Sequence, residues 1–299
     1  MKKQQLNIFY TLDENFVIPF TVSMISLIEN NKDIDLNIRV IHSLKNDKVL
    51  KEINEYVFNR YGFQLNLQYF STDQFGKLPT SSFISKASYT RLLISDIVPE
   101  NIFSGLYLDC DTVVTGSIRE LADPGLFMDN EYCLLAAEDL NGKENVERFA
   151  ELGVKTQFYF NTGVLMINIE RWRIENAGEK LLQTAFKYLD KLKWHDQDIL
   201  NIFFAGKSGV LNRKFNCITK KKIEKKPAII HYSGASKPWH YIDNGPYKSE
   251  YKKYFKLTPF KDVKTEEIGA AKVYRKYLEL FKSKIGVESF SDTFNSFFK

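Results

Sequence analysis

The sequence predicts an α/β domain in which a mostly parallel, mixed sheet is flanked by helices. Strand-like and helix-like segments alternate between residues 6 and 70, which is the order typical of parallel sheets. Apolar runs at 106–114, 133–140 and 162–169 predict further buried strands. A chain of 299 residues, 44% of them hydrophobic and 26% charged, can bury a core large enough for this architecture.

The alternation consists of five segments whose apolar residues repeat with a recognisable period. Period two predicts strands, a spacing of three or four predicts helices, and Gly62 marks the end of the second helix. Folds of this order bind ligands beyond the carboxyl ends of their strands. In chain order the segments are LNIFYTL (6–12), FVIPFTVSMISLIENN (16–31), LNIRVIHSL (36–44), KVLKEINEYVFNRYG (48–62) and QLNLQYF (64–70).

The centre of the chain continues the pattern. A helix is expected over ASYTRLLISDIV (87–98), closed by Pro99, and a strand over LYLDCDTVV (106–114) follows it. CLLAAEDL (133–140) and TGVLMINI (162–169) predict strands. The stretch 172–192 predicts one further helix.

Two carboxylates stand in the apolar run 106–114. In a strand, Asp109 and Asp111 would project to the same face, with Cys110 facing the other way. Two adjacent carboxylates repel each other and favour a divalent cation between them, and such oxygen ligands suit magnesium or manganese. The alternative is a strand end that enters a turn with both aspartates solvated, and the pattern alone leaves it open.

The C-terminal part has a different character. Beyond Pro246 the sequence becomes rich in tyrosine, phenylalanine and lysine, and VYRKYLELFKSKI (273–285) places apolar residues on one helical face with basic residues around them. A helix docked on the main domain is the favoured interpretation. A helix on a membrane surface or against a partner is the alternative.

Composition narrows the class of protein. The net charge of +5 comes from dispersed lysines, so no nucleic-acid partner is predicted. The N-terminus has no signal-peptide pattern, and no run of about eighteen apolar residues predicts a membrane span. Cys110, Cys133 and Cys217 are too scattered for a disulfide framework, which favours reduced thiols in the cytoplasm.

Four stretches resemble, in order and spacing, the signature blocks of glycosyltransferase family 8. They are LYLDCDTVV, FYFNTGVLMINIERWR (158–173), WHDQDILN (194–201) and HYSGASKPW (231–239). The resemblance implies a GT-A type nucleotide-sugar-binding fold over residues 1–245, with 246–299 as an aromatic and basic helical extension. It also implies an enzyme that moves galactose or glucose from a UDP-sugar, in an α-linkage and with retention, to a glycan, glycolipid or glycoprotein.

The resemblance implies a manganese site, with magnesium as the alternative ion. Its ligands would be Asp109, Asp111 and His231, the first residue of HYSGASKPW. Two carboxylates and a neutral imidazole can hold manganese and leave positions for diphosphate oxygens.

Further positions match the residues with which the family binds its donor. TLDEN resembles the uridine-binding turn, where Asp13 and Asn15 would bond uracil and ribose and Phe16, a tyrosine in close relatives, would stack on the base. A turn capped by acidic residues explains the same stretch almost as well. Arg91, which could instead be a surface ion-pair partner, resembles an arginine that reaches the diphosphate or the sugar. The donor-binding residues that the resemblance implies are Thr11, Asp13, Asn15, Phe16, Arg91, Asp139, Asn161, Thr162, Asp196, Gln197, Gly234 and Lys237.

Two residues are candidates for the chemical step, Gln197 and Asp198. A covalent route would need a carboxylate, and Asp198 is the nearest candidate nucleophile because Gln197 is a poor one. Front-face attack is the favoured route. Two other functions fit the same residues: a UDP-sugar hydrolase, and a non-catalytic module that binds nucleotide sugars or glycans. A cytoplasmic location is expected, and peripheral contact of the C-terminal segment with the inner face of the membrane is the alternative to a docked helix.

Overall fold

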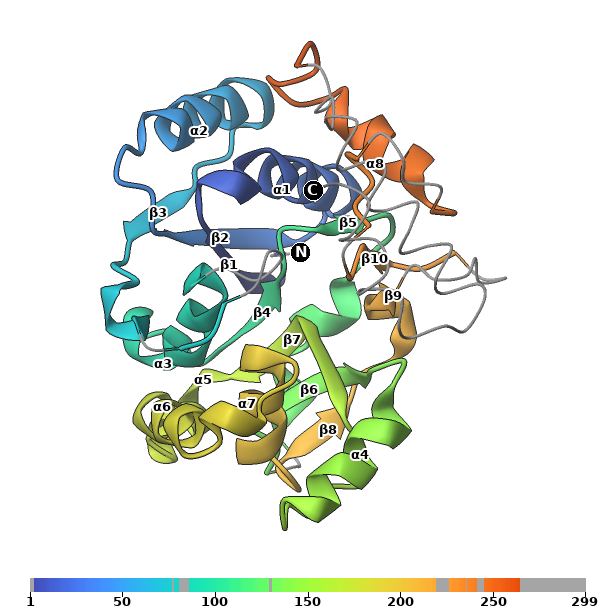
Figure 1. Cartoon of the computed structure of the whole chain (residues 1–299). Coiled ribbons are helices and arrows are strands. Elements are labelled where there is room, and N and C mark those ends of the chain that lie inside the picture. The colour runs from blue at the N-terminus through green and yellow to red at the C-terminus, as the bar shows by residue number, and fades with distance from the viewer. Residues whose placement is uncertain are drawn as a thin grey trace, which may run out of the picture.

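The computed structural model describes residues 3–76, 78–80, 86–128, 131–218, 226–234, 236–240 and 245–263. A seven-stranded sheet with the order β3-β2-β1-β4-β7-β6-β8 forms its centre, and a three-stranded sheet with the order β5-β10-β9 lies beside it (Figure 1). The strands are β1 (Gln5–Leu12), β2 (Asp35–His42), β3 (Asn66–Tyr69), β4 (Ser104–Leu108), β5 (Thr112–Val114), β6 (Leu134–Glu138), β7 (Phe160–Asn168), β8 (Ser208–Val210), β9 (Cys217–Ile218) and β10 (Ile229–His231).

Helices cover both faces of the large sheet, so the predicted α/β class is confirmed (Figure 1). Helices α1 and α2 lie on one side, and α3, α5, α6 and α7 lie on the other. The helices are α1 (Val17–Asn30), α2 (Lys48–Tyr61), α3 (Ile94–Ile97), α4 (Gly142–Glu151), α5 (Ile169–Ile174), α6 (Ala177–Lys187), α7 (His195–Phe203) and α8 (Lys248–Phe255).

Period-two alternation divides the core into two layers. In β1, Ile8 and Tyr10 pack with α1 and α2, whereas Phe9 packs with the helices of the opposite face. In β4, Leu106 belongs to the layer of α1 and α2, whereas Tyr107 belongs to the opposite layer. Because each fully buried side chain of this size contributes about 1.5–3 kcal/mol, these strands are held from both sides.

The sheet is mostly parallel, as predicted. Strands β1, β2, β3 and β4 pair in parallel, as do β6 and β8, while β7 runs antiparallel between β4 and β6. The carboxyl ends of β1, β4 and β6 therefore meet the amino end of β7 at one edge. The fold places polar residues from four strands at this edge.

The run 106–114 is not one strand, contrary to the prediction. β4 ends at Leu108 and β5 begins at Thr112, with Asp109 to Asp111 in a turn closed by a hydrogen bond from the Thr112 N–H to the Asp109 carbonyl (3.2 Å). Asp109 still donates its N–H to Gly163 of β7, whereas the Asp111 carbonyl accepts from Tyr232, which follows β10. The two aspartates therefore mark the crossover between the two sheets.

Two predicted helices are also corrected. The stretch 172–192 is broken between α5 and α6, because Asn176 adopts a left-handed backbone conformation (φ 49°) that an α-helix cannot accommodate. The stretch 87–98 forms a 3₁₀ helix over Lys86–Leu93, and only its end continues as α3.

Residues 245–263 pack on the predicted catalytic domain. Tyr247, Tyr251 and Tyr254 are buried in one cluster with Val22 and Ile230. The Tyr254 hydroxyl accepts a hydrogen bond from Asn30 (2.7 Å), and the Tyr56 hydroxyl donates to the Leu257 carbonyl (2.7 Å). The described residues 245–263 therefore pack on the part of the chain that precedes them. The helix predicted at 273–285 lies outside the described residues.

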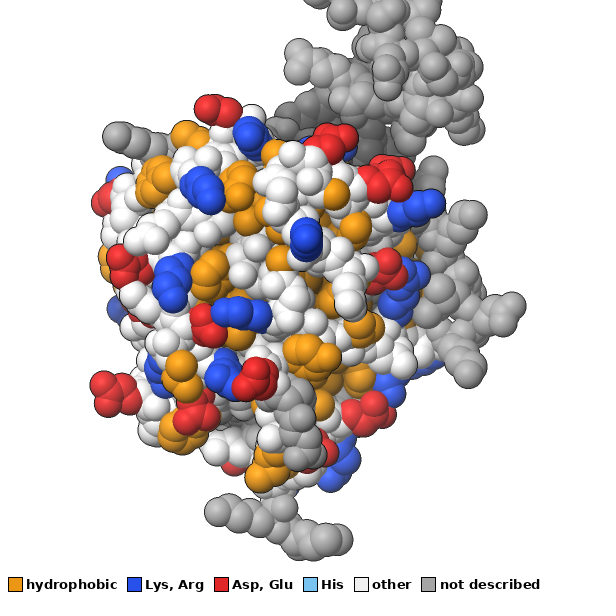
Figure 2. All heavy atoms as spheres, turned by 90° about the horizontal axis from the view of Figure 1, so that it is seen from below, with side chains coloured by type: hydrophobic (Ala, Val, Ile, Leu, Met, Phe, Trp, Pro, Cys, Tyr) orange, Lys and Arg blue, Asp and Glu red, His pale blue; other side chains and the backbone are white. Residues whose placement is uncertain are grey.

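The surface carries mixed charge where it can be seen. Figure 2 shows one face on which basic and acidic side chains lie interspersed among hydrophobic ones. Within the described part of the chain, no helix combines the length and the apolar character needed to cross a membrane.

Candidate active site

A cavity of about 630 Å³ opens at the edge where β1, β4 and β6 end. It collects almost all of the residues singled out from the sequence, although they come from segments far apart in the chain. Those that line it are Thr11, Asp13, Phe16, Arg91, Asp109, Asp111, Asp139, Asn161, Thr162, Asp196, Gln197, His231, Gly234 and Lys237.

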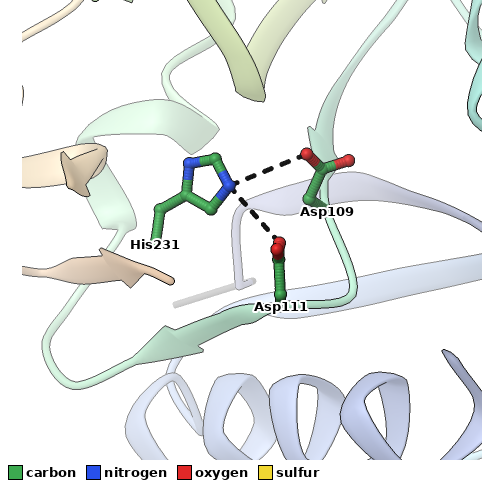
Figure 3. A group of neighbouring side chains, drawn as sticks. All are labelled: Asp109, Asp111 and His231. Carbon is green, nitrogen blue, oxygen red and sulfur yellow. Dashed lines mark ion pairs between the residues drawn. The ribbon is translucent and has the colours of Figure 1, made fainter. Parts of the chain in front are cut away.

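Asp109, Asp111 and His231 converge in this cavity (Figure 3). The Nε2 atom of His231 lies 3.8 Å from Asp109 Oδ2 and 3.3 Å from Asp111 Oδ1. Each of the three residues offers one ligand atom, and these three atoms all lie within 4.8 Å of one another. Asp109 and Asp111 reach this point from the crossover turn, and His231 reaches it from the last residue of β10.

Each carboxylate has one oxygen engaged by the protein. Asp109 Oδ1 accepts hydrogen bonds from Arg91 Nη2 (2.8 Å) and the Tyr107 hydroxyl (2.9 Å), and Asp111 Oδ2 accepts from the Lys237 ammonium. Asp109 Oδ2 and Asp111 Oδ1 remain, and both face His231.

Asp111 Oδ1 is buried and has no hydrogen-bond donor among the described residues. A buried carboxylate oxygen without a partner is costly, and a cation removes that cost. Burial raises the pKa of Asp111, but the Lys237 ammonium leads the groups that oppose burial, and the pKa lies below its usual value. Two ionised carboxylate oxygens and an imidazole nitrogen thus fit a divalent cation.

Arg91 is buried between two acidic side chains. Its guanidinium pairs with Asp109 (2.8 Å) and Asp196 (3.1 Å), and it also donates to the Thr162 carbonyl (2.9 Å). Burial raises the pKa of Asp196 to about 6, although Arg91 opposes this shift. Arg91 therefore orients Asp109, and its predicted contact with a donor stays a prediction.

Four of the residues predicted to bind the donor form one hydrogen-bonded cluster: Asp139, Asn161, Thr162 and Gln197. Gln197 Oε1 accepts from the Thr162 N–H (3.2 Å) and from Asn161 Nδ2 (3.1 Å). Gln197 Nε2 donates to the Tyr159 hydroxyl (3.1 Å) and to Asp139 Oδ2 (3.4 Å). Since both ends of the Gln197 amide are held, the cluster presents fixed donors and acceptors to the cavity.

Asp198 does not lie in the cavity, so the structure does not support it as a nucleophile. Its buried carboxylate accepts from Tyr159 (2.7 Å), from Arg148 (2.6 Å) and from the N–H groups of Lys193 (2.7 Å) and Trp194 (3.0 Å). It therefore holds the turn before α7.

Asn15 also does not line the cavity. Its backbone N–H donates to Asp13 Oδ1 (2.9 Å), which stabilises the turn after β1. This bond is the one expected for a turn capped by an acidic residue.

Asp198→Asn should destabilise the protein by roughly 1–3 kcal/mol, because a charged acceptor that satisfies four donors becomes neutral. Denaturant unfolding measures this loss, and Glu131→Gln, in an exposed pair with Arg171, is the control. Full stability combined with complete loss of turnover would restore Asp198 as a nucleophile candidate.

Gly163 lies against the His231 ring. A Cβ atom at this position would come 2.1 Å from Cε1 of His231, far inside contact distance. The buried strand β7 cannot move aside, so only glycine lets the imidazole reach its place.

Gly163→Ala should displace the imidazole and weaken the binding of any divalent cation at this site by about 10–100-fold, the range seen when support of a ligand is lost. Calorimetric titration of Mn²⁺ measures the change, with circular dichroism to verify the fold. Gly116→Ala is the control, because a Cβ there would meet Ala228 at an ordinary 3.4 Å. Unchanged Mn²⁺ affinity in Gly163→Ala would show that the close approach has no role.

Several cavity residues were not predicted, among them Ser88, Leu140, Asn141, Trp194 and His195. His195 has a left-handed backbone (φ 47°), and its Nδ1 is buried with no hydrogen-bond partner among the described residues. Trp194 is 38% exposed at the cavity. In the sequence, the only signal for Trp194 and His195 was their place directly before Asp196 in WHDQDILN.

Comparison with known proteins bears directly on this site. The model of the family described as "Glycosyl transferase family 8" matches residues 7–243. This range includes Asp109, Asp111 and His231. The chain belongs to glycosyltransferase family 8. The family resemblance read from the four motifs is thereby confirmed, and so is the assignment as a glycosyltransferase.

Named relatives and solved structures extend the family 8 assignment. A lipopolysaccharide 1,2-glucosyltransferase of Escherichia coli is 29% identical over 279 residues, covering 88% of this chain and 81% of that protein. A lipopolysaccharide 1,3-galactosyltransferase of Salmonella typhimurium is 30% identical over 251 residues, covering 79% and 73%. The structure of an active-site mutant of LgtC superposes with a TM-score of 0.75 at 22% identity, covering 85% of this chain and 96% of LgtC. The GT-A type fold predicted for this family 8 chain is thus confirmed.

Proposed function

We propose that the chain transfers galactose or glucose from a UDP-sugar to a carbohydrate acceptor, with retention and in an α-linkage. The observation that carries the proposal is the convergence of Asp109, Asp111 and His231 in a cavity shared with the Gln197 cluster. The names of the two lipopolysaccharide transferases favour these hexoses and a lipopolysaccharide-type acceptor. A second LgtC structure, described as a complex with donor and acceptor sugar analogs, supports the same pair of substrates.

The cation would be held by Asp109, Asp111 and His231, and manganese is the ion we propose, with magnesium as the alternative. When bound, it would neutralise negative charge on the diphosphate leaving group. Lys237 brings a second positive charge to the same place. Gly234, in the loop before Lys237, lines the cavity beside them.

The amide cluster would orient the transferred hexose. Asp139, Asn161 and Gln197 offer donors and acceptors that are fixed by one another, as a sugar with several hydroxyls requires. Thr162 lies beside this cluster and would influence the choice of hexose. Phe16, which lines the same cavity, would stack on the uracil ring.

Front-face attack is the route we favour. The bond between the anomeric carbon and the phosphate oxygen breaks, a bond to the acceptor oxygen forms on the same face, and the acceptor proton passes to the departing phosphate. No side-chain nucleophile is needed. This agrees with the contacts of the two nearby acids: Asp198 accepts a hydrogen bond from the Trp194 N–H in the turn before α7, and Asp196 forms an ion pair with Arg91.

The acceptor would lie near Trp194. Its exposed ring offers an apolar face of the kind on which sugars stack, and Leu140 lies at the same cavity. We propose a cytoplasmic enzyme, with membrane contact through the C-terminal segment as the alternative to a helix docked on the main domain.

Release of UDP from UDP-galactose and UDP-glucose, measured with and without lipopolysaccharide core acceptors, tests this function. Mn²⁺ is compared with EDTA, and the anomeric configuration of the product is determined. Acceptor-dependent release with an α-linked product is expected. Release that ignores the acceptor would identify a hydrolase instead, and donor binding without release would identify a binding module.

A further inference from the structure

The His231 ring has a second contact that bears on how it binds a cation. Its Nδ1 lies 3.1 Å from Asn216 Oδ1, and both side chains are buried. Asn216 stands just before β9, and β9 pairs in parallel with β10, which carries His231. Either ring nitrogen of a neutral histidine can carry the hydrogen, so the orientation of the Asn216 amide decides which one does.

That orientation can be traced to the backbone. The N–H of Gly163 donates to Asn161 Oδ1 (3.0 Å), and because a backbone N–H can only donate, this atom of Asn161 must be the oxygen. Asn161 Nδ2 then donates to Asp139 Oδ2 (3.2 Å) and to Gln197 Oε1 (3.1 Å), which also accepts from the Thr162 N–H. All of these bonds agree on one orientation for Asn161.

Asn216 is oriented in turn. Its Nδ2 donates to Asn161 Oδ1 (2.9 Å), which leaves its Oδ1 facing His231 as an acceptor. The Nδ1 atom of His231 must therefore carry the hydrogen. The lone pair of Nε2 then points toward Asp111 Oδ1 (3.3 Å) and Asp109 Oδ2 (3.8 Å).

We propose that Asn216 is a positioning residue that, together with Asn161 and the Gly163 backbone, holds His231 as its Nδ1–H tautomer. In the opposite tautomer, Nε2–H would donate to Asp111 Oδ1 and satisfy that buried oxygen without a cation. The hydrogen bond from His231 Nδ1 to Asn216 prevents this contact between Nε2–H and Asp111. It keeps three acceptor atoms facing one point: His231 Nε2, Asp111 Oδ1 and Asp109 Oδ2. Its consequence for cation binding rests on the proposed metal-dependent function.

The tautomer can be observed directly in the metal-free protein by long-range ¹H–¹⁵N correlation of the histidine rings, with His231 assigned from His231→Ala. We expect Nδ1–H in the wild type. Asn216→Leu keeps a similar volume but removes the acceptor, so the ring should shift to Nε2–H, and Mn²⁺ affinity should fall about 10–100-fold.

Two further variants sharpen the test. Asn216→Asp keeps an acceptor for Nδ1–H, so it should retain the tautomer and bind Mn²⁺ more tightly than Asn216→Leu. Asn212→Ala, in the same loop, removes only a bond from the Lys214 N–H and should leave both readouts unchanged.

A wild-type His231 that carries its hydrogen on Nε2 would overturn the proposal, whether or not any variant folds. The same holds if Asn216→Leu folds and keeps both Nδ1–H and wild-type Mn²⁺ affinity. A wild-type protein with Nδ1–H but without Mn²⁺ affinity would support the role of Asn216 in setting the tautomer. That result would count instead against the proposed metal-dependent function.

Discussion

Asp109→Asn and Asp111→Asn should each reduce sugar transfer by at least about 10²–10³-fold, the loss typical when one fixed group that stabilises a charged transition state is removed. Each substitution replaces a negative ligand by a neutral amide of the same shape. In both variants the oxygen held by Arg91 or Lys237 can still accept its bond, so the fold should persist.

UDP release across a Mn²⁺ titration, together with thermal unfolding, checks these variants. Asp111→Asn should be the less stable of the two, by roughly 1–3 kcal/mol, because the buried Lys237 loses its carboxylate partner, whereas Arg91 keeps Asp196 when Asp109 is neutralised. Asp190→Asn, at an exposed position, is the control. A wild-type rate in either Asp109→Asn or Asp111→Asn would remove the cation assignment.

Deletion of residues 246–299 should unfold the protein, whereas deletion of 264–299 should not. The longer deletion removes Tyr247, Tyr251 and Tyr254, which are buried against Val22 and Ile230. At about 1.5–3 kcal/mol for each large side chain, the loss is comparable with the whole stability of many domains.

The two truncated proteins are compared by thermal denaturation and by UDP release. The shorter deletion removes the basic amphipathic segment predicted at 273–285, so we expect it to retain donor turnover while transfer to the natural acceptor or binding to anionic vesicles falls. If deletion of 246–299 melts like the full chain, the tyrosine cluster does not support the core.

Much of the fold was predictable because its strands have regular patterns. The segments at 6–12 and 36–44 alternate between two buried layers, so their period identifies β1 and β2. The run 106–114 was misread because its apolar residues look the same whether the chain stays in one sheet or crosses to another. Asn176 breaks the predicted helix. Asparagine is enriched in the left-handed conformation, but a single asparagine inside a helical pattern is a weak signal for a break.

Asp109 and Asp111 were predicted from side-chain type and spacing, and His231 was predicted from the family resemblance. Residues whose role depends on contacts between distant parts of the chain were not predicted. Asn216 and Gly163 matter only because a folded chain brings them to His231. Asp198 was nominated because it follows Gln197 in the chain, but neighbouring residues on a helix point to different sides.

The crossover turn has a mechanical consequence. Asp109 is bonded through its backbone to the seven-stranded sheet, and Asp111 is bonded to the three-stranded sheet that also carries His231. A cation held by Asp109, Asp111 and His231 would therefore act as a clip that links the seven-stranded sheet to the three-stranded sheet. By mass action, such a clip adds about 2.7 kcal/mol to the unfolding free energy when the ion is present at one hundred times its dissociation constant. Without the ion, the buried hydrogen bond from Asn216 Nδ2 to Asn161 Oδ1 (2.9 Å) already joins the two sheets beside the site, so a bound cation would add a second link between them.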